Sequence, residues 1–410
     1  MSVEDRLRAL LSGTSVALLL VLSALVALCS FYLLFLALAS CFARRRRPAA
    51  RTARTHFAIL IPAHDEELVI GQLLASTGAL AYPADRFTVH VVADHCRDRT
   101  VAIARQHACR VHEHTDPALP GKARSLNWAI ARLLATTPAE RQPDAFVIVD
   151  ADSTVPPDLL TALDARLQAG EAIIQTRVDI EQPGQTWVSS LRRIAYACIA
   201  QLRPLGRGAL GLSAGLRGNG MCFARPIAAR YGWNPTALTE DYELHATLQL
   251  AGLRVAYAGE VAVRTQMPTT LTVVRSQSNR WERGRLQVMA RFAPRLLLSG
   301  LRRRSWAPID GALELLIPPF SIVVGLAAAL LAVALVARQP AAGALAAIGL
   351  GAQALYVARA LMLIPGRSPG LYLALLCAPF FIAWKVPLYL VAAFRRGSGQ
   401  WTRTARMPGK

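Results

Sequence analysis

Residues Ala145–Pro156 read AFVIVDADSTVP. The apolar run Phe146–Val149 predicts a short buried strand, and the polar residues after it are expected at the strand's carboxyl end, where α/β sheets bind ligands. Two carboxylates one residue apart, Asp150 and Asp152, can face one cation in such a turn. Oxygen ligands of this kind suit Mg2+ or Mn2+, which take further ligands from water and phosphates. Acidic pairs are also common in solvated turns, so the motif alone leaves both interpretations open.

The composition is typical of a membrane protein. Hydrophobic residues make up 53% of the 410 residues, and the formal net charge is +20. Such a surplus suits nucleic acid, anionic lipid or small anionic substrates. The arginines Arg44–Arg47 directly follow an apolar run, and others follow the last one, as the positive-inside rule requires. No zinc-finger, homeodomain or RNA-recognition signature is present, so we expect membrane lipids and no nucleic acid as partners.

Apolar segments predict where the chain crosses a membrane. Residues Val16–Phe42 are long enough to span a bilayer, and because the arginines follow this run, we interpret it as a retained anchor rather than a signal peptide. The domain after it is then expected on the cytoplasmic face of the plasma (inner) membrane. Three later runs are also long enough to span, namely Ala312–Ala337, Ala341–Ile364 and Leu371–Phe394.

These four spans would leave the basic C-terminal tail outside the cell. Either residues 317–319, which read Ile-Pro-Pro, break the second span, or Lys385 and Pro387 interrupt the last one, or the tail disobeys the charge rule. The sequence leaves these alternatives open. The expected domains are an N-terminal transmembrane helix with its basic flank (1–54), a cytoplasmic α/β domain (55–265), amphipathic interfacial helices (266–310), C-terminal transmembrane helices (311–394) and a basic tail (395–410).

Between the first and second spans, short β-rich runs alternate with helical patterns, which predicts a mostly parallel α/β sheet with its site at the strand ends. The expected strands are Phe57–Ile61, Val89–Val92, Phe146–Val149, Ala172–Gln175 and Val255–Tyr257. The expected helices are Glu66–Thr77, Thr100–Gln106, Lys122–Leu134, Pro157–Gln168 and Asp241–Leu250.

Polar residues follow several of these strands. Glu66 comes after the first strand, where it is either functional or a complement to the helix dipole. Asp94 ends the second strand, which is a better place for a ligand. Lys122 follows a glycine at a helix start, where a phosphate would meet backbone N–H groups and an ammonium. Each of these residues has an ordinary structural alternative.

Two later stretches also carry candidates. Residues 239–241 read Thr-Glu-Asp, and Thr239 is expected to cap a helix that has Glu240 and Asp241 in its first turn. Residues Arg275–Arg295 form a basic stretch with aromatic residues, which suits a helix along a membrane surface.

Taken in order, these motifs resemble the membrane-bound inverting glycosyltransferases of family 2, relatives of cellulose, chitin and hyaluronan synthases and of lipid glucosyltransferases. The resemblance covers roughly residues 56–290. Each motif is weak alone, but their order and spacing are specific. The motifs are the Pro-Ala-x-x-Glu opening at Pro62, Asp94, Gly121-Lys122, Asp150-x-Asp152, Thr239-Glu240-Asp241 and Gln277-x-x-Arg280-Trp281.

The resemblance implies a GT-A, Rossmann-like domain inserted between transmembrane helices. It implies that Asp94 contacts the nucleobase, that Asp150 reaches the nucleotide, and that Asp152 ligates Mg2+ or Mn2+. It assigns Asp241 as the general base. The remaining residues would line the donor diphosphate or the acceptor, and they are Glu66, Lys122 and Arg280 on the donor side and Glu240, Gln277 and Trp281 on the acceptor side.

The implied reaction moves a hexose or N-acetylhexosamine from a UDP-sugar to a growing polysaccharide or a lipid. One direct displacement inverts the anomeric carbon, so a second catalytic carboxylate is unnecessary. The sequence departs from the family at His95, Cys96 and Arg97, where relatives commonly carry Asn and small polar residues, and it lacks a clear cellulose-synthase gating loop. The alternative is a non-catalytic membrane protein that keeps a nucleotide-sugar fold. The oligomeric state is left open.

Overall fold

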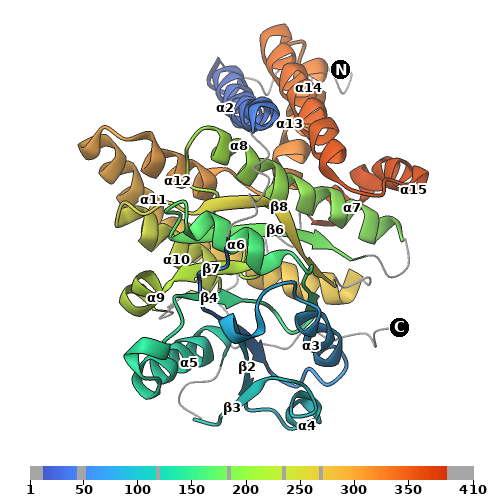
Figure 1. Ribbon diagram of the computed structural model, residues 1–410. Helices are drawn as coiled ribbons and strands as arrows, with labels where there is room; N and C mark the ends of the chain where they lie inside the picture. The colour runs from blue at the N-terminus through green and yellow to red at the C-terminus, as the bar shows by residue number, and fades with distance from the viewer. Residues whose placement is uncertain are drawn as a thin grey trace. The chain divides into compact units, whose positions relative to one another are not determined.

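The computed structural model describes residues 13–43, 52–116, 121–181, 186–232, 237–266 and 271–385, with the backbone alone at 271–277 and 279 (Figure 1). Contacts divide the chain into two compact units. The helical unit comprises residues 1–43, 185–210 and 314–395, and the α/β unit comprises residues 44–184, 211–313 and 396–410. The boundaries follow composition, since the apolar segments gather in one unit and the β-rich segments in the other.

The described part of the α/β unit contains an eight-stranded sheet in the order β3-β2-β1-β4-β7-β6-β8-β5. Neighbouring strands are parallel except where β7 pairs with β4 and β6, and where β5 pairs with β8. The strands are β1 (Phe57–Ala63), β2 (Phe87–Asp94), β3 (Arg110–His114), β4 (Ala145–Ile148), β5 (Ser153–Thr154), β6 (Ile173–Ile180), β7 (Met221–Ala224) and β8 (Ala256–Thr265).

The core of this unit lies on both faces of β1 and β4, whose residues are almost all apolar and buried. On one face, Phe57, Ile59 and Ile61 pack against α3 (Ile70–Gly78), α4 (Thr100–Ala104) and α6 (Leu159–Leu167). Burial on both faces explains why these strands are apolar runs rather than alternating patterns.

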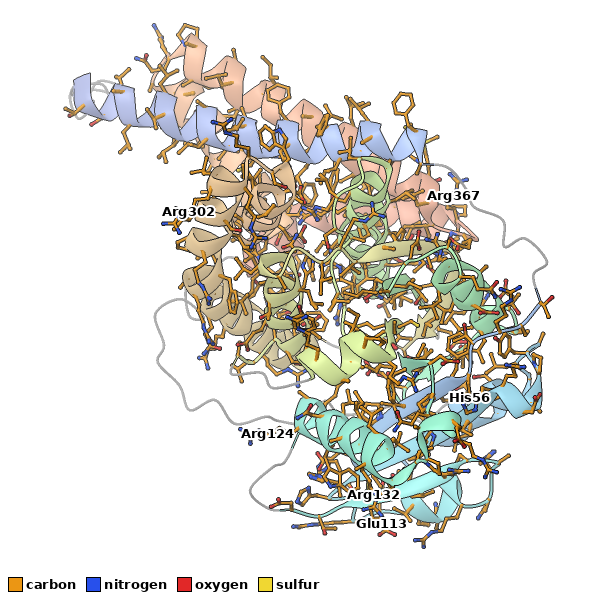
Figure 2. The ribbon with its side chains drawn as sticks, turned by 60° about the vertical axis from the view of Figure 1, so that its left-hand side comes forward. His56, Glu113, Arg124, Arg132, Arg302 and Arg367 are labelled. Carbon is orange, nitrogen blue, oxygen red and sulfur yellow. The ribbon has the colours of Figure 1, made fainter. Side chains whose placement is uncertain are left out.

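The other face is covered by α5 (Lys122–Thr136) and α9 (Arg225–Tyr231). Helix α5 buries apolar residues such as Leu126 and Ile130 and exposes Arg124 and Arg132, both labelled in Figure 2. This amphipathic pattern fixes the rotation of α5 about its axis. It thereby fixes where the first residue of the helix, Lys122, lies.

All five expected strands and all five expected helices are present, with shifted ends. The largest differences are that β8 ends at Thr265 and not at Tyr257, that β6 ends at Ile180 and not at Gln175, and that α3 begins at Ile70 and not at Glu66. Asp65 has φ +54°. The N–H of Glu66 is bonded to the Thr100 hydroxyl at 2.7 Å, and that of Glu67 to the Asp98 carboxylate at 3.0 Å. This turn is held by the neighbouring loop instead of entering the helix.

Further helices complete the α/β unit. Helix α10 (Glu240–Leu250) precedes β8, and α11 (Leu271–Arg303) and α12 (Trp306–Leu316) follow it. Short 3-10 turns lie at Ala84–Arg86 and Ala139–Arg141. The expected basic helix is therefore present as α11, which extends beyond both ends of Arg275–Arg295.

In the helical unit, α2 (Gly13–Ala39, continued by a 3-10 turn to Phe42) packs parallel to α14 (Pro340–Leu363). Leu19 clusters with Ala342 near the start of both helices. The Gln353 amide donates to the Ser30 hydroxyl at 2.9 Å, and Arg359 donates to the Ser40 hydroxyl at 3.0 Å. Later residues of α2 therefore contact later residues of α14, so the two helices run in the same direction.

Two described helices, Thr14–Phe42 and Pro340–Leu363, are long and apolar enough to cross a membrane. A third span results only if α12 and α13 (Phe320–Val336), which are separated at residues 317–319, count as one broken span. The expected last span appears in the described residues only as a shorter apolar helix, Pro369–Lys385, which begins with α15 (Pro369–Leu373). Pro387 and the rest of that expected span lie outside the described residues.

The segment between β6 and β7 belongs to the helical unit and is absent from the expected helices. It contains α7 (Trp187–Tyr196), a π-helical turn (Ala197–Leu202) and α8 (Arg203–Ala209). A Cβ on Gly206 would lie 2.2 Å from the Leu36 carbonyl oxygen, so only glycine permits this approach of α8 to α2. Buried Arg207 forms an ion pair with Glu314 and donates to the Tyr32 hydroxyl at 2.8 Å. These contacts attach the segment to the apolar helices.

Candidate active site

The turn after β4 holds the first two candidate carboxylates. Val149 is fully buried, whereas the Asp150 side chain is 32% exposed. The Asp150 N–H donates to Oδ1 of Asn219 at 3.1 Å, and the Asn219 amide donates to the Ser153 hydroxyl at 2.8 Å. Asn219 therefore fixes the backbone of the turn and leaves the Asp150 carboxylate to interact elsewhere.

Lys122 reaches that carboxylate from the start of α5. Its Nζ donates to Asp150 and to the Gly218 carbonyl, the latter at 2.6 Å. Burial acts to lower the pKa of Lys122, but the nearby charges of Asp150, Glu240 and Asp241 outweigh burial and raise it. Lys122 is therefore a fixed cation surrounded by three carboxylates.

The loop at Gly218–Gly220 brings Lys122 and Asp241 together. Gly218 has φ +76° and Gly220 has φ +64°, a region that favours glycine. A methyl group on Gly218 would lie 3.6 Å from Oδ2 of Asp241 and 3.8 Å from Nζ of Lys122. The loop backbone is therefore the point at which three distant segments meet.

Asp241 lies in the first turn of α10 and has a strongly perturbed carboxyl group. Burial and the adjacent charge of Glu240 raise the pKa of Asp241 to about 7, against the N–H of Tyr242 and the charges of Arg217 and Lys122, which lower it. A carboxylate with a pKa near the working pH is suited to accept a proton and to release it again.

Thr239 occupies the N-cap position of α10, but the expected capping hydrogen bond is absent. Its hydroxyl is buried without a hydrogen-bond partner among the described residues. Helix α11 approaches Thr239 closely, since a Cβ on Gly284 would lie 2.6 to 2.8 Å from three of its atoms. Arg291 of α11 also donates to Glu243 at 3.0 Å. Helix α11 is therefore packed along the start of α10.

Three candidates lie on α11, about one or two turns before Gly284. Arg280 is half-buried, and the Trp281 side chain is 39% exposed. The side chain of Gln277 lies outside the described residues. Arg280 and Trp281 therefore lie about one helical turn from Gly284, the residue of α11 that approaches Thr239.

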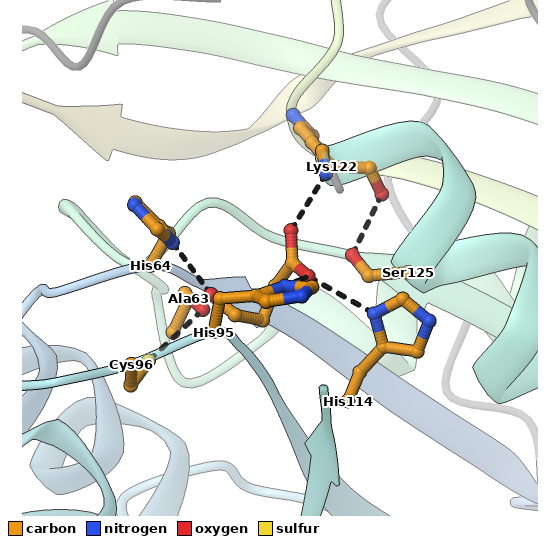
Figure 3. A network of polar contacts seen from close by, with 9 residues as sticks. Ala63, His64, His95, Cys96, His114, Lys122 and Ser125 are labelled. Atoms are coloured by element: carbon orange, nitrogen blue, oxygen red, sulfur yellow. Dashed lines mark hydrogen bonds and ion pairs between the residues drawn. The ribbon is translucent and has the colours of Figure 1, made fainter. Parts of the chain in front are cut away.

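Asp94, the last residue of β2, accepts three hydrogen bonds. Its Oδ1 faces Nδ1 of His95 at 2.7 Å and Nδ1 of His114 at 3.0 Å, and its Oδ2 accepts from the Gly121 N–H at 2.8 Å. Burial alone would raise the pKa of Asp94, but these bonds outweigh it and lower the pKa. Asp94 is thus ionised and connected through Gly121 to Lys122. Figure 3 shows Lys122 above the rings of His95 and His114.

Glu66 and Asp152 lie at other edges of this region. Glu66 is buried in the turn between β1 and α3, and its backbone is tied to the loop after β2. Asp152 faces the end of β8, where the Thr265 hydroxyl donates to its Oδ1 at 3.4 Å and the Gln266 N–H donates to its carbonyl at 3.3 Å. The structure therefore groups Lys122, Asp150 and the Glu240–Asp241 pair most closely.

The donor atoms available at the β4 turn fit a hard cation. Asp150 and Asp152 are half-buried and offer only oxygen, which suits Mg2+ or Mn2+. The ligand atoms of Asp94, His95 and His114 also lie within 4.8 Å of one another, but the hydrogen bonds of Asp94 already use this arrangement. The carboxylates of the β4 turn could therefore hold a divalent cation.

Sequence reasoning missed three residues that build the site. Asn219 and Gly218 belong to a Gly-x-Gly stretch that by itself indicates only a bend. His114 ends β3, a polar edge strand that no apolar pattern marks. Asn219 is a polar residue in a turn near the predicted sheet, which marks it as a candidate, but the sequence does not reveal its role.

The profile described as "Glycosyltransferase like family 2" matches residues 53–284, over half of the chain. The protein therefore belongs to glycosyltransferase family 2, as the order of its motifs predicts. Beta-monoglucosyldiacylglycerol synthase of Synechocystis sp. is 30% identical over 243 residues, which cover 56% of this chain and 47% of that protein.

Glucomannan 4-beta-mannosyltransferase 7 of Arabidopsis thaliana is 21% identical over 252 residues, covering 59% of this chain and 44% of that protein. The chain spans about half the length of the curated relatives it matches. Among solved structures, mannosyltransferase PcManGT of Pyrobaculum calidifontis, in complex with GDP-Man and Mn2+, has a TM-score of 0.54 at 18% identity and covers 84% of this chain and 98% of that one. The α/β unit thus has the predicted GT-A, Rossmann-like fold.

Proposed function

We propose that the protein is a membrane-integrated, inverting glycosyltransferase that moves a hexose or N-acetylhexosamine from a UDP-sugar to a lipid or a growing polysaccharide. The observation that carries this proposal is that Asp241 and Lys122 meet at Gly218 while Lys122 binds Asp150. A base for the acceptor hydroxyl and a cation for the leaving diphosphate are the groups that promote a direct displacement of a nucleoside diphosphate.

In this mechanism, Asp241 accepts the proton of the acceptor hydroxyl while that oxygen attacks the anomeric carbon. Its pKa of about 7 allows it to be ionised before the step and protonated after it. Lys122 and Arg280 stabilise the charge that grows on the leaving diphosphate. Because a single displacement occurs, the configuration at the anomeric carbon inverts.

The other candidates hold the two substrates. Asp94 binds the nucleobase, and Glu66 and Asp150 hold the remainder of the nucleotide. Asp152 would hold Mg2+ or Mn2+, which stabilises the diphosphate electrostatically when bound. The Mn2+ in the PcManGT complex supports this assignment. Glu240, Gln277 and Trp281 line the acceptor side.

The acceptor and the location follow from the relatives and the helices. The names of the Synechocystis and Arabidopsis relatives specify a glucosyl lipid and a glucomannan, so a lipid and a polysaccharide remain the two acceptor classes. The candidate spans, with Arg44–Arg47 after the first of them, support a location in the inner membrane with the active site in the cytoplasm.

The decisive test is UDP release by the purified protein in nanodiscs, across a panel of UDP-sugars. We expect release with Mg2+ or Mn2+ and none after chelation, with Asp152→Ala inactive. Asp241→Asn should lose transfer by about 10²- to 10⁴-fold and retain UDP binding, because the amide cannot accept the proton. Full activity of Asp241→Asn would remove the assigned base.

Product mass analysis distinguishes the acceptors. A ladder of added sugars indicates a polysaccharide, whereas a single lipid-sugar adduct indicates a lipid. UDP binding without turnover on any sugar would instead support a non-catalytic nucleotide-sugar protein.

A further inference from the structure

The carboxylate of Asp94 is almost fully occupied before any ligand binds. An ionised carboxylate only accepts hydrogen bonds, so each imidazole facing it carries its hydrogen on Nδ1. His95 and His114 therefore both donate to Oδ1, and Gly121 donates to Oδ2. Since each oxygen has two lone pairs, Oδ1 is saturated, and among the described residues Oδ2 retains one acceptor position.

The two histidines are held firmly in this arrangement. His114 is 2% exposed, and its ring centroid lies 5.0 Å from that of Trp128, which in turn lies 5.6 Å from the Arg132 guanidinium. The rings of His95 and His114 meet edge to face at 5.8 Å, as Figure 3 shows. His95 also has φ +52°. Neither ring leaves Oδ1 without repacking its neighbours.

The remaining acceptor lies on the oxygen that faces the Gly-Lys loop. Oδ2 bonds the N–H of Gly121, and the next residue, Lys122, reaches Asp150. With the nucleobase at Asp94 and the diphosphate at Lys122, as in the proposed function, the remaining position on Oδ2 is the one left for the base. This single acceptor matches a base edge with one ring N–H between two carbonyl oxygens, which is uracil. Guanine presents adjacent ring and exocyclic N–H groups, which need both oxygens of a carboxylate.

We propose that His95 and His114 are specificity-determining residues that saturate Oδ1 of Asp94 and thereby select uracil over guanine in the donor nucleotide. This inference rests on the proposed function. It concerns a choice that the GT-A fold leaves open, because the PcManGT complex, which shares this fold, contains GDP-Man. Neither histidine touches the reacting atoms; both act through Asp94.

The first test compares the dissociation constants of UDP and GDP for the full-length protein by calorimetry with Mg2+ or Mn2+. We expect UDP to bind at least about tenfold more tightly, because guanine would leave one buried N–H without an acceptor. Equal binding, or tighter binding of GDP, overturns the inference without any variant.

The second test removes both hydrogen-bond donors to Oδ1 of Asp94. In the double variant His95→Ala/His114→Leu, both lone pairs of Oδ1 become available, so the ratio of the two dissociation constants should fall toward one. When His114 is replaced by Asn instead of Leu, the amide nitrogen can take the place of Nδ1. His114→Asn should therefore keep most of the preference for UDP over GDP. His107→Asn changes a histidine of the same unit outside the site and should leave the ratio unaltered.

A merely structural role predicts a different result. Loss of packing would weaken UDP and GDP alike and leave their ratio at the wild-type value, which contradicts the inference. If the double variant does not fold, the single variant His95→Ala supplies the same ratio, because the His95 side chain is 26% exposed and less embedded. Transfer from a GDP-sugar in place of a UDP-sugar would defeat this inference and the donor named in the proposed function, but not glycosyl transfer itself, whereas absence of transfer from any nucleotide sugar would defeat the proposed function as a whole.

Discussion

At Asp241, burial and the neighbouring Glu240 raise the carboxyl pKa, and Lys122 opposes them. The three groups are therefore linked, because a change in one charge alters the proton affinity of the base. Lys122 then has two tasks, since the charge that stabilises a leaving diphosphate also keeps the base ionised near neutral pH.

This linkage predicts the pH dependence of the reaction. The base acts when ionised, so kcat/KM should fall as pH decreases through about 7, the pKa of Asp241. In Lys122→Gln, the cation that lowers this pKa is absent, and the acid limb should move to higher pH by about one unit. The measurement is a pH profile of kcat/KM for both proteins.

The control for this profile is Arg124→Gln, which removes a positive charge from the exposed side of the same helix. Its acid limb should coincide with that of the wild type. An acid limb that stays in place in Lys122→Gln, or that moves to lower pH, would contradict the linkage.

At the scale of elements, the packing of α11 against α10 determines where the Thr-Glu-Asp turn lies. Gly284 is the contact point, because any side chain there overlaps Thr239. We expect Gly284→Ala to push the two helices apart and to lower kcat by about tenfold to a hundredfold, since small misplacements of a catalytic group have large effects. Steady-state kinetics on a UDP-sugar measures this loss.

Gly71→Ala is the matched control. Gly71 also lies inside a helix of the α/β unit, but a Cβ there is 3.7 Å from Ile103, which is ordinary contact. This substitution should leave kcat unchanged and stabilise the unit by about 0.5–1 kcal/mol. Equal kinetic effects of the two substitutions would show that the contact at Thr239 is unimportant.

The elements that sequence predicts well are those whose burial imposes a pattern. Strands β1 and β4 are apolar runs, and α5 has one buried and one exposed face, so the sequence reveals these elements. Strand β3 is a polar edge strand, and β7 is four residues long and antiparallel to both neighbours. A short or polar strand is defined by its hydrogen bonds to neighbouring strands. A local sequence pattern does not reveal those neighbours.

The candidate site divides in the same way. The order of the acidic motifs predicts Asp150 and Asp241 in the site, and the structure brings them together through Lys122 and Gly218. Asn219 was missed because its task is to hold a turn across 69 residues of sequence. Contacts of that range arise only from the folded sheet.

At the scale of the molecule, the parallel packing of α2 and α14 predicts membrane topology. Helices that advance together end on the same side, so residues near Cys41 and Gly366 should share one side of the membrane and Gln339 should face the other. A membrane-impermeant maleimide should therefore label Cys41 and Gly366→Cys from the same side in sealed vesicles. Mass spectrometry of the labelled peptides distinguishes them from other thiols.

Gln339→Cys is the reciprocal probe, since it precedes the first residue of α14. It should be labelled only from the opposite side. Labelling of Gly366→Cys together with Gln339→Cys would mean that α14 does not cross the bilayer.

The path of the chain between β6 and β7 limits how the protein can be divided. After β6 the chain runs through α7, the π-helical turn and α8, all in the helical unit, before it returns as the loop with Asn219. A truncation at either end of the chain that stops short of residues 186–210 therefore leaves this excursion in the protein. Deleting α2 and α14 would expose Ile194, Cys198 and Leu202 of the excursion, so a truncated enzyme intended for expression without detergent should aggregate unless the excursion is replaced by a short linker.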